Sequence, residues 1–183
     1  MTPQEEIEAL IARVAMADRK AFRALYSRTS AKLFGIALRV LRDEAAAEDV
    51  LQDVYVRVWN RAGAYRSNGY SPMTWLITIT RNAAIDRLRK ARREGVAQEP
   101  VEIAERLYDT APGPAQQAEM RDEARALNAC LDELPADRAE MVRRVYLQGL
   151  TYQELSDQSG VKLNTVRTWL RRSLMQLREC LSA

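Results

Sequence analysis

Residues 151–169 read TYQELSDQSGVKLNTVRTW, and this stretch decides the fold of the C-terminal part of the chain. Thr151 followed by Glu154 is a capping-box pattern, which predicts that a helix begins here. Gly160 then allows a tight turn into a longer helix that runs to about Leu181. Two crossing helices need apolar or small side chains where they touch. This segment has such residues at Leu155, Ser156, Val161, Val166 and Trp169. The spacing predicts a helix-turn-helix.

The second helix of this pair is basic. In helix-turn-helix proteins that bind DNA, the second helix enters the major groove and presents its N-terminal side chains to the bases. Arg and Thr can contact base edges, and Lys near the turn can contact phosphate. The side chains expected to be free for such contacts are Lys162, Thr165, Arg167, Thr168, Arg171 and Arg172. A helical hairpin that binds no DNA is the alternative interpretation.

Helical periodicity extends over most of the remaining sequence. Asp18, and Ser71 followed by Pro72, are typical of the residues that precede a helix, so helices are expected after Asp18 and from Ser71 to about Arg93. Apolar residues spaced for one helical face predict another helix from about Glu44 to Arg61. Further helices are expected over residues 114–131 and 136–148, and no segment has the alternation of a strand. The sequence therefore predicts an all-α fold.

The charge of the chain is unevenly distributed. The 183 residues include 28 basic and 25 acidic ones, with a net charge of +6 over residues 1–92, −4 over 93–120 and +1 over 121–183. The middle stretch is acidic, contains several Pro and is weakly apolar, which is typical of a linker. We expect two helical domains, residues 1–93 and 116–183, joined by a flexible linker over 94–115. A basic cluster in residues 81–93, together with the basic second helix, suggests two contacts with one polyanion. A merely solvated helix face is the alternative interpretation of such a cluster.

The composition excludes several classes of function. The chain has no His, which rules out Ser-His-Asp and Cys-His nucleophiles, a His general base and zinc sites that contain His. No apolar stretch is long enough to span a membrane, and the N-terminus lacks a signal-peptide pattern. We expect a cytoplasmic protein with no membrane insertion, no cofactor and no metal.

Two cysteines lie on the first and last helices expected in the C-terminal domain. Cys130 and Cys180 could approach each other and form a redox-sensitive bridge. For a chain in a reducing compartment the pattern favours two small, reduced core residues instead.

Three motifs, in order, resemble a known family. The first is Ala47–Val54 with Arg57, Val58 and Trp59, and the second is Thr74–Leu76 with Arg81–Arg89. The third combines Leu134, Pro135 and Arg138 with residues 149–155 and 164–167. From about Asp18 to Leu181 the chain resembles bacterial alternative sigma factors of the extracytoplasmic-function (ECF) group of the sigma-70 family. The lack of a middle domain fits this group. Ser156 and Asn164 depart from the Ala and Gly that are common in the family, and Asn164 can alter which bases are read.

The resemblance implies a division of labour. Residues 1–93 correspond to sigma region 2, which binds core RNA polymerase and melts the promoter, and residues 116–183 to region 4, which reads the upstream element as duplex. The residues implied to bind core polymerase are Glu48, Asp49, Gln52, Asp53 and Arg57. Those implied to contact the downstream element as single strand are Tyr65, Arg66, Asn68, Gly69, Trp75, Asn82, Asp86, Arg87, Arg89 and Lys90. Those implied to contact the upstream element are Lys162, Asn164, Thr165, Arg167, Thr168, Arg171 and Arg172. The family also implies an inhibitory anti-sigma partner.

Other interpretations stay open at this point. A two-lobe regulator with a ligand-sensing N-terminal domain would share the helix-turn-helix, although the acidic helix and the Asn82 helix argue against it. A helical enzyme lacks any nucleophile–base pair, and a pure protein-interaction module is a third alternative. For single residues, the acidic face near Asp53 could be merely solvated, and Trp75 could be a core residue.

Overall fold

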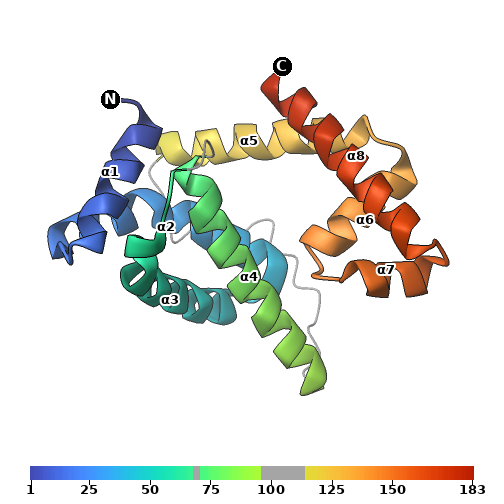
Figure 1. The fold of residues 1–183 in the computed structure, drawn as a ribbon, viewed down its shortest axis with the longest axis horizontal. Coiled ribbons are helices and arrows are strands. Elements are labelled where there is room, and N and C mark those ends of the chain that lie inside the picture. The colour runs from blue at the N-terminus through green and yellow to red at the C-terminus, as the bar shows by residue number, and fades with distance from the viewer. Residues whose placement is uncertain (68–70, 96–113) are drawn as a thin grey trace. The chain divides into compact units, whose positions relative to one another are not determined.

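The computed structural model describes residues 1–67, 71–95 and 114–183 (Figure 1). Within these ranges every regular element is a helix, which confirms the expected all-α class. The chain divides into two compact units, Met1–Asp109 and Thr110–Ala183. Most of the predicted linker lies outside the described residues, as do Asn68 and Gly69 of the predicted downstream-element site.

The first unit contains four α-helices and one 3₁₀ turn in its described part. They are α1 (Pro3–Ala15), α2 (Arg19–Leu41), α3 (Glu44–Arg61), the turn η1 (Ala62–Ala64) and α4 (Pro72–Arg93). The helix starts follow the capping signals in the sequence. The Asp18 side chain accepts hydrogen bonds from the backbone N–H groups of Lys20 and Ala21, and the Ser71 hydroxyl accepts one from Met73. These contacts confirm the predicted N-caps of α2 and α4.

The core of the first unit forms around α2, which packs against α1, α3 and α4. Leu25, Leu33 and Ala37 of α2 are fully buried, together with Val54 and Val58 of α3. The apolar positions that predicted α3 are all buried, because a repeat of three and four residues places them on one side of the helix.

The second unit contains α5 (Pro114–Asp132), α6 (Ala136–Tyr146), α7 (Tyr152–Ser159) and α8 (Leu163–Ser182). Helix α8 packs against the other three. The capping box of Thr151 and Glu154 is present at the start of α7, as predicted. Gly160 ends α7 with φ +72°, a left-handed conformation that suits glycine. Residues 151–169 therefore fold as a helix-turn-helix, as predicted.

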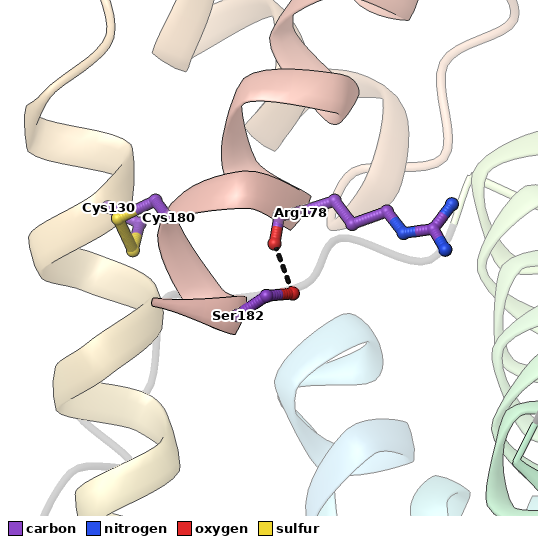
Figure 2. The surroundings of a disulfide bond; sticks show 4 residues. All are labelled: Cys130, Arg178, Cys180 and Ser182. Carbon is purple, nitrogen blue, oxygen red and sulfur yellow. Dashed lines mark hydrogen bonds between the residues drawn. A yellow bond between two sulfur atoms is a disulfide. The ribbon is translucent and has the colours of Figure 1, made fainter.

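A disulfide joins α5 to α8 in the second unit (Figure 2). The Cα atoms of Cys130 and Cys180 are 5.9 Å apart, within the usual range for a disulfide. The two reduced cysteines that the sequence favoured are therefore not what the structure contains. Periodicity places each cysteine on the inner face of its helix, but only the packing of α5 against α8 brings the two sulfur atoms together.

In the described ranges, no helix is both long and apolar enough to cross a bilayer. The same ranges hold no group of three or more Cys, Asp or Glu side chains placed to hold a metal ion.

Candidate functional site

Helix α3 presents a polar face of mostly acidic residues. The predicted polymerase-binding residues Glu48, Asp49, Gln52, Asp53 and Arg57 are all exposed. They alternate along the helix with the buried positions that hold α3 against α2. The structure therefore brings the five predicted residues together on one free surface. An exposed acidic surface of this kind can attract a basic partner and guide its docking.

A buried polar contact fixes α3 against α2. The Thr29 hydroxyl lies 2.6 Å from the Tyr55 hydroxyl and also donates to the Leu25 carbonyl at 2.7 Å. Burial raises the pKa of the Tyr55 phenol, so its hydroxyl is neutral and can share a hydrogen bond. No local sequence pattern predicts this pair, because its members are 26 residues apart and only the crossing of α2 and α3 brings them together.

Aromatic side chains surround this contact. The Phe22 ring packs edge-on against Tyr55 and Trp59, with centroids 6.1 and 5.2 Å away. The Tyr26 ring packs against the Tyr55 ring with their centroids 4.7 Å apart, and Tyr26 is nearly half exposed. Edge-to-face pairs of this kind add stability beyond the apolar area that they bury. These aromatic contacts therefore help to hold α3, which carries the acidic face, against α2.

The segment between α3 and α4 begins with a well-anchored turn. The Tyr65 ring packs against Trp75 of α4, with centroids 5.3 Å apart. The Arg66 guanidinium donates to the carbonyls of Gly63 and Tyr65, at 2.8 and 2.9 Å. Both aromatic rings are half-buried, so Trp75 is a partly packed residue and keeps some free surface. These contacts fix the start of the loop that includes the two undescribed residues Asn68 and Gly69.

The polar face of α4 carries the remaining residues predicted for the downstream element. Asn82, Asp86, Arg87 and Lys90 are exposed, and Arg89 is half-buried. Trp75 precedes Asn82 by seven residues, so the two lie on one side of α4 about 10 Å apart along its axis. Thr80, Ala84 and Leu88 are buried and hold the helix to the core. The face offers one amide for base edges and several cations for phosphate.

The second unit exposes the basic surface predicted on α8. Lys162, Asn164, Arg167, Arg171 and Arg172 are exposed, while Thr165 and Thr168 are half-buried. The Arg167 guanidinium donates to the Asn164 side-chain oxygen at 3.4 Å. The Thr168 hydroxyl donates to the Asn164 backbone carbonyl at 3.0 Å, within the helix. Val166 and Leu170 are buried on the opposite face. Helix α8 therefore has a cationic face that is exposed and an opposite apolar face that packs in the core.

Two contacts that sequence reasoning missed hold α8 in place. The Ser156 hydroxyl donates to the Val161 carbonyl at 2.5 Å, across the turn between α7 and α8. The Arg138 guanidinium lies over the Trp169 ring, 3.5 Å from its centroid. Such a cation–π contact ties α6 to α8. Ser156 was singled out only for its small size, and Arg138 only as part of a motif.

The chain was compared with known proteins. Residues 25–94 match the family Sigma-70 region 2, and residues 124–177 match Sigma-70, region 4. The chain is 34% identical to the ECF RNA polymerase sigma factor SigK of Mycolicibacterium vanbaalenii, over 96% of this chain and 89% of that protein. It is 33% identical to SigK of Mycobacterium ulcerans, over 98% and 95% of the two chains.

The chain belongs to the ECF group of sigma-70 family RNA polymerase sigma factors. As a sigma factor it serves promoter-specific transcription by RNA polymerase. Among solved structures, the sigma factor is similar to SigE of Rhodobacter sphaeroides in complex with the anti-sigma ChrR. The two chains are 27% identical in sequence, and their structures superpose with a TM-score of 0.49. The match covers 94% of this chain and 99% of that chain. It is also similar to CnrH in complex with the cytosolic domain of CnrY, at 20% identity and a TM-score of 0.42, over 97% of each chain.

Proposed function

We propose that the sigma factor divides its work among three helices. The face of α3 binds core RNA polymerase, the polar face of α4 with the loop before it engages the downstream promoter element as single strand, and α8 reads the upstream element as duplex. The domain limits that go with this proposal are residues 1–93 for region 2, 94–115 for the linker and 116–183 for region 4.

One observation carries this proposal. The exposed face is mainly acidic on α3 but contains several cations on α4 and α8, and each face lies opposite a buried apolar stripe. Acidic side chains suit a basic protein surface, whereas Arg and Lys suit the phosphates of DNA. The three faces also lie within or beside the segments that match regions 2 and 4.

The polymerase interface is tested by reversing one charge. We expect Asp53→Lys to weaken holoenzyme formation, because a cation would replace an exposed carboxylate in the centre of the α3 face. Co-elution of the full chain with core polymerase in gel filtration measures this. The control is Glu133→Lys, which makes the same change at an exposed position in the other unit. Normal co-elution of the Asp53 variant would contradict the assignment.

The upstream interface is tested on α8. We expect Arg171→Ala to reduce discrimination between upstream-element variants while core binding stays intact. One lost base contact is worth about 1–3 kcal/mol, or roughly five- to 150-fold in discrimination. Arg178→Ala is the matched control, since Arg178 is exposed on the same helix two turns further on. Unchanged promoter selectivity of the Arg171 variant would remove α8 from the proposal.

The remaining features of the proposal concern the setting in which the chain works. We place it in the cytoplasm with the polymerase, which supplies all of the catalysis, so the sigma factor is not an enzyme by itself. The ECF resemblance supports an inhibitory anti-sigma factor as a further partner. Transcript sequencing after reconstitution with core polymerase tests the function as a whole, because it identifies the promoters that this chain selects.

A further inference from the structure

Helix α1 is an integral part of the first unit, although it precedes the segment that matches region 2. Ile11 and Val14 are fully buried in the core, and Ile7 and Leu10 pack against it. The helix contacts α2, α3, α4 and the turn η1. In Figure 1, α1 lies beside the turn that follows α3. Its apolar face therefore supports more than the neighbouring helix α2.

Polar contacts hold both ends of α1. At the start, the Thr2 side chain and the Glu5 side chain form a capping box. Near the start, Glu6 also pairs with Arg28 of α2. At the end of α1, the Arg13 guanidinium forms an ion pair with the Asp18 carboxylate, with 2.6 Å between nitrogen and oxygen. The two ion pairs tie α1 to α2 and to the residue that caps α2, and α1 also contacts η1.

The contacts of η1 continue toward the downstream-element loop. Ala62 in η1 is buried, and the backbone N–H of Tyr65 donates to its carbonyl at 3.2 Å. Burial raises the pKa of the Tyr65 phenol, and the nearby negative charge of Glu8 on α1 raises it further. The Tyr65 ring in turn packs against Trp75. A continuous set of packed groups therefore leads from α1 through η1 and Tyr65 to the first turns of α4.

We propose that α1 is a positioning element for the downstream promoter element, with Leu10 and Glu8 as its positioning residues. Leu10 packs against the core of the first unit and so helps to hold α1, which contacts η1. The η1 turn leads into Tyr65, whose ring packs against Trp75, so the position of η1 sets where the loop to Ser71 begins. Glu8 is half-buried on the same helix and adds a negative charge to the element that contacts η1. A negative charge there opposes unspecific attraction of phosphates. This inference rests on the proposed role of α4 and of the loop before it.

The test uses full-length variants Leu10→Ala and Glu8→Gln in reconstituted holoenzyme. Transcription is measured on two promoter sets, one varied only in the downstream element and one varied only in the upstream element. For both variants we expect discrimination between downstream-element sequences to fall by roughly threefold or more, the size typical of residues that act through others. Discrimination between upstream-element sequences and co-elution with core polymerase should not change.

Two controls separate positioning from general stability. Val40→Ala truncates a buried residue of the same core, twelve residues beyond Arg28 along α2 and so far from α1. It should lower transcription from all promoters by the same factor. Ala12→Gln changes an exposed position of α1 and should leave both discriminations unchanged.

Two results would overturn the inference: downstream discrimination that stays at the wild-type level in both α1 variants, or an equal loss at both promoter elements. Asn82→Ala tells this failure apart from failure of the proposed function. If the Asn82 variant loses downstream discrimination while the α1 variants keep it, only the role of α1 is wrong. If the Asn82 variant also keeps it, the assignment of α4 is wrong as well.

Discussion

Among single residues, Thr29 of α2 and Tyr55 of α3 form a polar contact that links these two helices inside the core. Thr29 is 1% exposed and Tyr55 is 4% exposed. A buried hydroxyl is unfavourable unless it is hydrogen-bonded, and here each hydroxyl has a partner. The pair therefore favours one arrangement of α3 on α2 over rotated alternatives, and with it the direction of the acidic face.

We expect Tyr55→Phe to lower the free energy of unfolding by about 1 kcal/mol, the usual size of a neutral hydrogen bond. Thr29 keeps its bond to the Leu25 carbonyl in this variant, so no buried hydroxyl is left unpaired. Urea unfolding measures the change. Tyr26→Phe is the control, because the Tyr26 ring packs on Tyr55 but is nearly half exposed. Equal stability of the Tyr55 variant and the wild type would show that the bond is not stabilising.

Asp18 predicts a dependence of stability on pH. Hydrogen bonds from the backbone of Ala21 and from the Arg13 side chain lower the pKa of this carboxyl below its usual value. The pKa of the Asp18 carboxyl is therefore lower in the folded state than in the unfolded state. Its ionised form stabilises the fold near neutral pH, and this stabilisation is lost as the pH falls through the folded-state pKa. Asp18→Asn keeps a capping oxygen but cannot titrate. We expect the wild type to be the more stable at pH 7 and the difference to disappear in acid. A constant difference in urea midpoint at both pH values would contradict this.

Among the elements, α8 combines the largest number of roles in the second unit. It carries the cationic surface, closes the core against α5, α6 and α7, and is joined to α5 by the Cys130–Cys180 disulfide. The bridge lies close to the end of the helix, near Arg178 and Ser182 in Figure 2, whereas the proposed DNA-binding residues lie at the start and in the first half of the helix. Loss of the bridge therefore acts first on packing and not on the DNA-binding surface.

We expect reduction of the disulfide to destabilise the second unit. The bridge spans 50 residues of sequence, and cross-links of this kind contribute typically about 2–4 kcal/mol. Thermal unfolding of the wild type should shift downward in reductant. The double variant Cys130→Ala with Cys180→Ala is the control and should not respond to reductant. The mass shift on thiol alkylation, with and without reductant, reports the redox state directly. Absence of a shift in the reduced wild type would contradict a stabilising role.

For the whole molecule, the distribution of charge matters more than its total. A net charge of +3 over 183 residues is small, yet acidic side chains predominate on the exposed face of α3 and basic ones on the exposed faces of α4 and α8. One chain can therefore bind a protein surface and a polyanion without either interaction cancelling the other. The two helices proposed to bind DNA, α4 and α8, belong to different compact units and therefore to different cores.

We expect the salt dependence of promoter binding to report these faces. Each phosphate contact contributes about 0.9 to the slope of log affinity against log salt concentration. Replacing Arg171 and Arg172 together by Ala should therefore reduce the slope of holoenzyme binding to upstream-element duplex by about 1 to 2. Arg178→Ala serves as the comparison and should leave the slope unchanged. A slope that is insensitive to the double replacement would show that these cations do not contact phosphate.

Much of the fold could be predicted because the signals are local. Capping residues such as Asp18, Ser71 and Thr151 act within one turn, so each helix start is readable from a few adjacent residues. The repeat of apolar residues then tells which face of α3 or α8 is buried. Residues that lie off this apolar face are expected to be exposed to solvent. The exposed residues of the candidate site could be predicted in this way from the apolar repeat.

Contacts between distant parts of the chain depend on how the helices cross, and only the tertiary structure decided those. Tyr55 finds Thr29, Arg138 finds Trp169 and Cys130 finds Cys180 because particular helices pack at particular heights. Periodicity gives the direction of a side chain around its own helix axis but no information on the neighbour that it meets. For that reason the sequence by itself determined the helices, their exposed faces and the sigma-factor family. The bonds that hold those faces in position, and the support that α1 gives to η1, required the three-dimensional packing.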